Sequence, residues 1–314
     1  GEPVAVVIAD DRYLAEDALA LIEVEYQTLP AVVEVMAAMA ADAPILHSDV
    51  GSNLVNERQF NYGNPETAFA DATHVVRASV RYPRNSCTPM ECFGLVAEYL
   101  AAEQSYDVLA NFQGPYALHP VMARALKVPG SRLRLRTPAD SGGSFGVKQA
   151  IFPYIVAMAL AARKARRPVK WVEDRLEHLV AANSATGRIS NISAAVAADG
   201  VIEALELEQI EDCGAYLRAP EPASLYRMHG ILTGAYNIPH LAVTNRIVLT
   251  NRTPSGLNRG FGGPQVYFAL ERLMQRIAIE LNLDPLDVIR RNLVPAASMP
   301  YRAAAGAVLD SGDY

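Results

Sequence analysis

Two glycine-rich turns hold most of the residues that could bind a ligand. The later turn, residues 250–265, carries Arg259 and Phe261 among four glycines, and the earlier turn, residues 140–148, carries Phe145 and Lys148. Glycine allows positive φ and lets a ligand approach the main chain closely. A guanidinium beside such a loop suits an anionic or carbonyl-bearing ligand. Taken alone, an ordinary strand-to-helix turn explains either loop equally well.

A third loop, residues 111–116, places Gln113 between an expected strand and an expected helix. Its amide can donate to an oxo group without introducing charge. Both glycine-rich turns also lead into helices, whose first N–H groups bind anions. Three polar loops with two aromatic rings therefore suit an anionic cofactor together with a flat substrate.

The elements that must position these loops are mixed in type. Helix-like patterns follow each loop, at residues 116–126, 150–165 and 266–281, and a strand pattern at 241–249 precedes the last. Strands and helices do not alternate regularly along the chain, which favours an α+β fold over a doubly wound sheet. The other expected strands are 3–9, 75–82, 93–100, 105–112, 132–136, 169–172, 189–196 and 201–210, with residues 24–35 extended. The other expected helices are 13–25 with Asp10 or Asp11 as cap, a short one from Asn64-Pro65, 220–233, and 285–293 with Asp284 as cap.

Composition excludes several classes of partner. With 314 residues and 51% hydrophobic content, about two domains are expected. A net charge of −6 gives no basic surface for nucleic acid. No apolar run reaches the roughly 18 residues of a membrane span. Three cysteines without a CxxC pair indicate free thiols in a reducing compartment, so a cytoplasmic location is expected.

Other catalytic signatures are missing from the sequence. The six histidines show no paired zinc-binding spacing. Nucleophile-elbow, dinucleotide and Walker motifs are also absent. Cys92 follows Glu91, which suggests a Cys–Glu pair, but a buried strand cysteine is the favoured interpretation.

Three motifs, taken in order, resemble a known family. The runs Asn258–Gln265 and Gly142–Lys148, with Gln113-Gly-Pro, are similar to the molybdopterin-binding large subunit of the xanthine dehydrogenase and aldehyde oxidase family. The opening residues resemble the end of that family's α/β hammerhead domain. The resemblance implies a partial hammerhead domain at residues 1–35, a connector at 36–56, and the first part of the molybdopterin-binding domain at 57–314.

The resemblance also implies roles for individual residues. No side chain would bind molybdenum directly, because the pterin would hold the metal. Gln113 would donate to the apical oxo ligand, and Arg227 would orient substrate and stabilise developing negative charge; a plain helix-surface arginine remains an alternative for Arg227. The implied cofactor-binding residues are Gln113, Gly143, Phe145, Gly146, Arg259, Gly262 and Gly263. The implied substrate-binding residues are Phe145, Gln149, Arg227 and Phe261.

Three departures from the family pattern narrow the expectation. Gln149 stands where purine-oxidising members carry glutamate, which argues against a purine substrate. Gly260 stands where carbon monoxide dehydrogenases carry a copper-binding cysteine, which argues against that activity. Nothing after Asp310 supplies the catalytic glutamate of the family's Gly-x-Gly-Glu motif. The general base is therefore expected on another segment or chain, and this chain as a fragment or one piece of a divided subunit.

The implied reaction hydroxylates an N-heterocycle or an aldehyde with water-derived oxygen. The cysteines lack ferredoxin spacing, so [2Fe-2S] and FAD are expected in partner subunits or domains. The expected partners are thus a C-terminal molybdopterin-binding segment or chain, an iron–sulfur subunit, an FAD subunit and a small-molecule substrate. Two alternatives remain: a non-catalytic binding or maturation module that keeps the fold without the cofactor, and an unrelated α+β enzyme whose loops match by chance.

Overall fold

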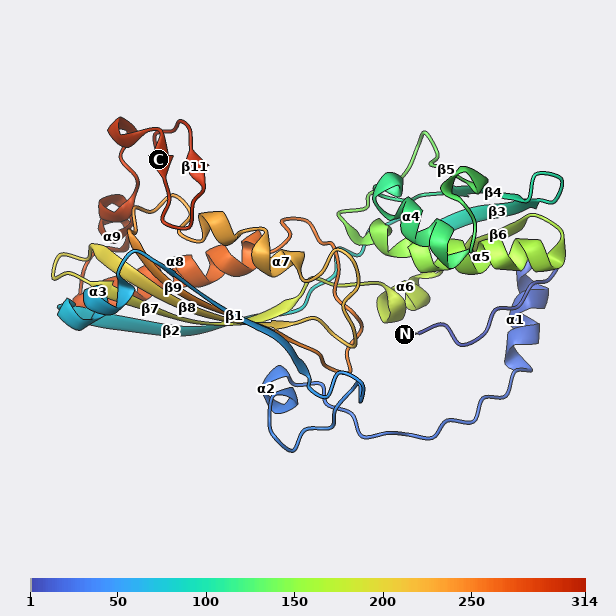
Figure 1. Cartoon of the computed structure of the whole chain (residues 1–314), viewed down its shortest axis with the longest axis horizontal. Coiled ribbons are helices and arrows are strands. Elements are labelled where there is room, and N and C mark those ends of the chain that lie inside the picture. Colours follow the sequence, from blue (N-terminus) through green and yellow to red (C-terminus); the bar gives the residue numbers. More distant parts are fainter. Residues whose placement is uncertain (1) are drawn as a thin grey trace. The chain divides into compact units, whose positions relative to one another are not determined.

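The computed structural model describes residues 2–314, which pack as two units (Figure 1). Of the described residues, the first unit comprises 2–30, 86–184 and 256–259, and the second comprises 31–85, 185–255 and 260–314. Each unit combines a sheet with helices, so the predicted α+β class is confirmed. The units are defined by packing, and the domain limits predicted at residues 35 and 56 stay predictions.

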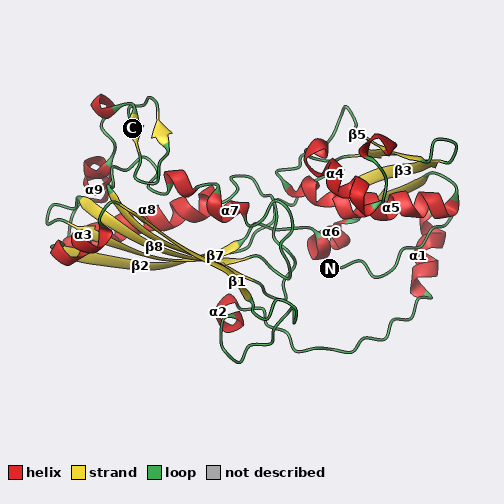
Figure 2. Ribbon diagram, in the orientation of Figure 1, coloured by secondary structure: helices red, strands yellow, loops and turns green. Residues whose placement is uncertain are grey.

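The first unit is a four-stranded sheet covered by helices (Figure 2). Its strand order is β5 (Leu133–Arg136), β4 (Ser105–Ala110), β3 (Gly94–Leu100) and β6 (Val169–Val172), with β4 and β5 parallel and the other pairs antiparallel. Helices α4 (Pro115–Ala125) and α5 (Phe152–Ala165) bury their apolar positions against this sheet. The remaining elements are α1 (Arg12–Ala20), α6 (Arg175–Ala181), and the short 3-10 helices Gly130–Arg132 and Val147–Ile151.

The second unit is a five-stranded sheet with one long helix across it. The order is β1 (Leu54–Tyr62), β9 (His240–Val248), β8 (Ile202–Asp212), β7 (Gly187–Val196) and β2 (His74–Tyr82), and only β8 and β9 are parallel. Helix α8 (Gly263–Leu281) buries Val266, Leu270, Leu273 and Ile277, whose spacing of three to four residues makes one apolar face. The smaller elements are α2 (Val35–Ala38), α3 (Pro65–Asp71), α7 (Ala223–Tyr226), α9 (Pro285–Asn292), β10 (Tyr301–Arg302), β11 (Val308–Leu309), and 3-10 turns at His229–Ile231 and Ala296–Ser298.

Helix starts follow the capping signals in the sequence. Asp11 accepts the N–H of Leu14 at the start of α1, and Asp284 accepts those of Leu286 and Asp287 at the start of α9. Helix α3 begins after Asn64 with proline in its first turn, as predicted, although the Asn64 side chain makes no capping bond. No helix within residues 2–314 combines the length and the apolarity needed to cross a bilayer.

Three predictions about elements were wrong. The expected strand at residues 3–9 and the extended run at 24–35 pair with no strand within residues 2–314. A strand needs a neighbour for its N–H and C=O groups, and an apolar run alone does not supply one. The expected helix at 220–233 reduces to α7 and one 3-10 turn, because prolines 220 and 222 break the pattern. Helix α6 was not predicted, although Asp174 and Glu177 form a capping box there.

Candidate cofactor-binding loops

The amide of Gln113 is held in one orientation by the earlier glycine-rich turn. Its side-chain oxygen accepts the backbone N–H of Gly146 at 3.0 Å and the hydroxyl of Ser144. A backbone N–H can only donate, so the oxygen must face this turn. The NH₂ group then has no acceptor within residues 2–314. The first unit therefore presents an oriented pair of N–H donors at the end of β4.

The earlier turn itself exposes backbone donors. Phe145 and Gly146 adopt positive φ of 52° and 108°, and a Cβ on Gly146 would lie 2.7 Å from the carbonyl oxygen of Leu257. A Cβ on Gly143 would lie 2.7 Å from the Phe145 ring. Backbone packing thus accounts for Gly146, whereas at Gly143 the close atoms belong to the exposed Phe145 ring, which can move aside. Within the described chain, the N–H groups of residues 143–145 meet no acceptor, a pattern that suits anion binding.

Arg259 belongs to the same unit as this turn. Its backbone N–H donates to the carbonyl oxygen of Phe145 over 2.8 Å, and the thiol of Cys87 lies 3.1 Å from the same oxygen. The guanidinium is exposed and has no hydrogen-bond or ion-pair partner among residues 2–314. The structure therefore brings Gln113, Phe145, Gly146 and Arg259 together, with the Arg259 charge available for a ligand.

Lys148 is buried under the earlier turn and stabilises it, so its ammonium is not available to a ligand. It is 1% exposed, and its ammonium binds Glu91 and the carbonyl oxygen of Gly142. Glu91 also accepts from the side chain of Asn111 at 2.7 Å and from the N–H of Gly142 at 2.9 Å. The hydrogen bond from Lys148, followed by that from Asn111, lowers the pKa of Glu91 to about 2. The sequence analysis did not predict the ion pair between Lys148 and Glu91. The two residues are 57 positions apart in the sequence, and no local pattern connects them.

Gln149 follows Lys148 and carries an unsatisfied oxygen. Its backbone N–H donates to the Gly146 carbonyl at 3.1 Å. Its side-chain Oε1 is buried without a donor among the described residues. Buried polar atoms are usually paired, so this oxygen is an exception that lacks a donor within the described residues.

The second unit holds the remaining predicted residues. Arg227 closes α7, and its guanidinium carbon lies 5.9 Å from the centroid of the Phe261 ring. Phe261 is 8% exposed. Gly262 has a φ of 90°, and a Cβ there would lie 1.9 Å from the Ser224 carbonyl oxygen. Gly263 differs, because a Cβ there would meet Met228 and the Tyr267 ring only at an ordinary 3.6 Å. The chain's own packing requires glycine at 262 and leaves glycine at 263 unexplained.

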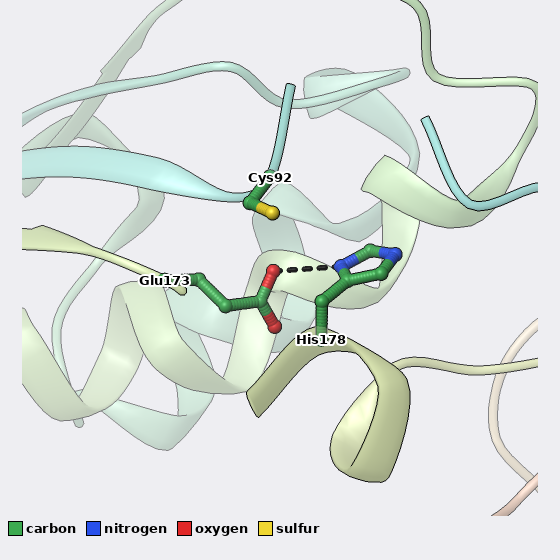
Figure 3. Close-up of side chains that lie close together, drawn as sticks. All are labelled: Cys92, Glu173 and His178. Atoms are coloured by element: carbon green, nitrogen blue, oxygen red, sulfur yellow. Dashed lines mark hydrogen bonds and ion pairs between the residues drawn. The ribbon is translucent and has the colours of Figure 1, made fainter. Parts of the chain in front are cut away.

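One group of side chains of metal-ligand type lies in the first unit (Figure 3). Cys92 precedes β3, Glu173 follows β6 and His178 lies in α6, with ligand atoms within 4.8 Å of one another. His178 Nδ1 is 2.7 Å from Glu173 Oε2, which also accepts the N–H of Phe93 at 3.1 Å. The second ring nitrogen points away from Cys92 in Figure 3. Glu173 and His178 Nδ1 therefore form a buried hydrogen-bonded pair, while His178 Nε2 is buried without a partner among the described residues.

The suggested Cys92–Glu91 pair is wrong, because Glu91 binds Lys148 while Cys92 faces Glu173. Cys92 is half-buried and lies just before its strand, so the favoured buried strand cysteine is only partly correct. Burial raises the pKa of its thiol, with the Arg175 guanidinium opposing the rise. Cys92 is thus a poor candidate for a reactive thiolate.

The donor set fits an anionic cofactor rich in oxygen. The Gln113 amide, the N–H groups of residues 143–145 and the Arg259 guanidinium all donate. Phosphate and oxo groups accept such bonds, and charge-assisted ones are the stronger. These backbone and side-chain donors would hold the organic part and the oxo groups of a cofactor. None of them would bind a metal ion directly.

Comparison with known proteins agrees with this donor set. Residues 46–293 match the family described as molybdopterin cofactor-binding domain. The carbon monoxide dehydrogenase large chain of Hydrogenophaga pseudoflava is 32% identical over all of this chain and 41% of its own length. Subunit gamma of the 6-hydroxypseudooxynicotine dehydrogenase complex of Paenarthrobacter nicotinovorans is 33% identical, with coverage of 100% and 40%.

A solved structure gives the same relationship. Quinoline 2-oxidoreductase from Pseudomonas putida 86 superposes with a TM-score of 0.89 at 32% identity, covering 98% of this chain and 39% of that one. This chain spans about two fifths of the length of these relatives. The chain belongs to the molybdopterin cofactor-binding domain family, within the xanthine dehydrogenase and aldehyde oxidase group that its motifs resemble.

Proposed function

We propose that this chain is the cofactor-binding part of a molybdenum hydroxylase large subunit that oxidises an N-heterocycle or an aldehyde. The observation that carries the proposal is the Gln113 amide, whose NH₂ group is left free by the turn that binds its oxygen. Family membership supports the same cofactor. When bound, a molybdopterin-type cofactor supplies two-electron redox chemistry that uses oxygen from water.

The chain's own residues would bind and orient in this reaction. Gln113 would donate to an oxo group, while Gly143 and Phe145 would present backbone N–H groups and an aromatic ring, and Gly146 would hold the Gln113 amide in place through its own N–H. Arg259 places a positive charge for an anionic group. Gly262 and Gly263 are proposed to present main chain to the pterin at the start of α8, with the open space at Gly263, since the Ser224 carbonyl fills the space at Gly262. Phe261, Arg227 and Gln149 are proposed to contact the substrate, Phe261 by stacking.

The proposed substrate class follows from two positions and from the relatives. Gly260 supplies no thiol for copper, so carbon monoxide is not the proposed substrate although relatives include carbon monoxide dehydrogenases. Gln149 supplies no carboxylate for a purine. The relatives also include a nicotine 6-hydroxylase large subunit and a quinoline 2-oxidoreductase, whose names indicate N-heterocycles.

The proposed complex includes further parts. A C-terminal molybdopterin-binding segment or chain would supply the general base. An iron–sulfur subunit and an FAD subunit would receive the electrons, because the three cysteines here are single thiols without cluster spacing. We place the complex in the cytoplasm, where such thiols remain reduced.

The test is Gln113→Glu in the assembled protein. Glutamate keeps an oxygen that can accept from Ser144 and Gly146, and it lacks the NH₂ donors. We expect molybdenum content or turnover on a panel of N-heterocycles and aldehydes to fall about 10- to 100-fold. Gln59→Glu on the exposed face of β1 is the matched control.

Equal molybdenum content and turnover in Gln113→Glu and wild type would contradict the assigned role. Wild type without molybdenum, despite good cofactor supply, would instead support the non-catalytic module. Absorbance bands of iron–sulfur and flavin groups in the purified complex test the electron partners separately.

A further inference from the structure

A buried cluster of charged side chains lies beside Gly262 in the second unit. Arg188, Glu211 and Ser224 are 1%, 0% and 2% exposed, and Glu221 is 7% exposed. Arg188 binds both carboxylate oxygens of Glu211 and also donates to the Ser224 carbonyl at 3.3 Å. This bidentate ion pair assigns the negative charge of the cluster to Glu211.

The hydrogen atoms available do not match two ionised glutamates. The Ser224 hydroxyl oxygen lies 2.6 Å from Glu211 Oε1 and 2.5 Å from Glu221 Oε2. A hydroxyl carries one hydrogen and can donate to only one of these oxygens. The backbone N–H of Ser224 lies 3.3 Å from Glu221 Oε2 and does not bridge the two oxygens, so the second short oxygen–oxygen contact needs a hydrogen of its own. Among residues 2–314, Glu221 Oε1 is buried without a donor, which is costly for an ionised carboxylate.

We propose that Glu221 is a protonated carboxylic acid in mildly acidic solution, that it ionises near neutral pH, and that it acts as a positioning residue for the turn at Gly262. Glu221 donates to Ser224 Oγ, and Ser224 Oγ donates to Glu211. The Ser224 carbonyl oxygen lies against Gly262, where a Cβ would come within 1.9 Å of it. When Glu221 loses its proton, two ionised carboxylates face the Ser224 hydroxyl, which can donate to only one of them. The repulsion displaces Ser224. The effect on the cofactor rests on the proposed function, whereas the protonation state does not.

The surroundings of Glu221 support this assignment. Burial, and then the charge of Glu211, raise the pKa of Glu221 to about 7, against hydrogen bonds from Ser224 and the charge of Arg188. The other titratable or charged groups that interact with it are Arg84 and Cys213, and Arg218 lies on the same loop.

Protonation of Glu221 gives the folding free energy a defined pH dependence. The folded protein holds this proton more tightly than the unfolded chain, whose glutamate has a pKa near 4.5. The stabilising contribution is therefore complete below about pH 4.5 and is lost as the pH rises through about 7.

The experiment compares wild type, Glu221→Gln and Glu203→Gln in the assembled protein. Glutamine keeps the shape and can donate to Ser224, and Glu203 is an exposed residue of β8 that serves as control. Infrared spectra should show a protonated-carboxyl band in wild type and Glu203→Gln at pH 6. The band should disappear as the pH rises through about 7, and it should be absent in Glu221→Gln. A wild type without such a band overturns the proposal, even if the Glu221→Gln variant fails to fold.

Cofactor retention tests the positioning role. Molybdenum content of wild type should fall between pH 6 and pH 8, while that of Glu221→Gln should stay constant. Equal pH dependence in both proteins overturns the coupling to the Gly262 turn. Absence of molybdenum from all variants at every pH would contradict the proposed function instead, and the infrared result would still decide the protonation state.

Discussion

The backbone N–H of Arg259 donates to the carbonyl oxygen of Phe145 over 2.8 Å. This bond joins two glycine-rich loops that lie far apart in the sequence. It uses only main-chain atoms, so the Arg259 guanidinium remains free for a ligand. Side-chain substitution at residue 259 can therefore separate ligand binding from folding.

Replacing Arg259 by alanine should lower turnover about 100-fold, as loss of a single charged donor at an active site commonly does. The backbone bond to Phe145 remains in this variant, so the melting temperature should stay within 2 °C or so of wild type. Arg77→Ala, an exposed arginine of β2, is the control. Unchanged turnover in Arg259→Ala would exclude the assigned role.

Phe261→Leu should weaken aromatic substrates more than small aldehydes. Leucine retains apolar volume at this 8%-exposed position and removes the ring. Loss of stacking corresponds to about 1 kcal/mol, or about a fivefold change in kcat/KM for the aromatic substrates. Steady-state kinetics with both substrate classes measure the difference, with Phe268→Leu on the exposed side of α8 as control. Equal losses for both classes would count against stacking.

Two adjacent glycines should respond differently to alanine. Gly262→Ala forces a Cβ to within 1.9 Å of the Ser224 carbonyl at a φ of 90°, so we expect a loss of more than about 2 kcal/mol of unfolding free energy. The Cβ of Gly263→Ala makes only ordinary contacts, with the side chains of Met228 and Tyr267, at the start of α8. The stability of this variant should be unchanged or slightly higher, while its molybdenum content should fall. Full cofactor content in Gly263→Ala would show that the pterin does not approach this residue.

Glu91→Gln should destabilise the protein, because it leaves the buried Lys148 ammonium without its counter-charge. The cost should be about 2 kcal/mol, at the low end for such pairs because the Glu91 side chain is 42% exposed. With a pKa of about 2 in the folded state, Glu91 stabilises the wild type above about pH 4.5 and loses this effect as the pH falls toward 2. Acid titration of chemical unfolding measures the slope. An identical slope in wild type and Glu91→Gln would contradict the assignment.

Local signals in the sequence predicted most of the elements that surround the loops. Alternation in residues 75–82 predicted β2, and aspartates 11 and 284 predicted where α1 and α9 begin. The pairing of the Gln113 loop with the turn at Gly146 was expected only through the family resemblance, since nothing local indicates which loops meet. Apolar pattern alone was insufficient at residues 3–9, which pair with no strand among the described residues.

Long-range polar contacts account for what sequence reasoning missed. The two partners in each buried polar contact, Glu91 with Lys148 and Glu221 with Glu211, are not adjacent in the sequence. Taken alone, each residue resembles an ordinary surface charge. Their burial depends on the packing of several elements at once. The contrast between Gly262 and Gly263 is likewise invisible in the sequence, because it depends on where the Ser224 carbonyl lies.

Residues 86–184 depart from the five-stranded sheet and return to it at one place. Strands β2 and β7 are neighbours from His74↔Val196 to Tyr82↔Arg188, and the Ala185 N–H binds the Asn85 carbonyl at 2.8 Å. In topological terms, most of the first unit, residues 86–184, is an insertion within a single hairpin. Its length and internal sequence can therefore vary during evolution without changing the register of the sheet that receives it.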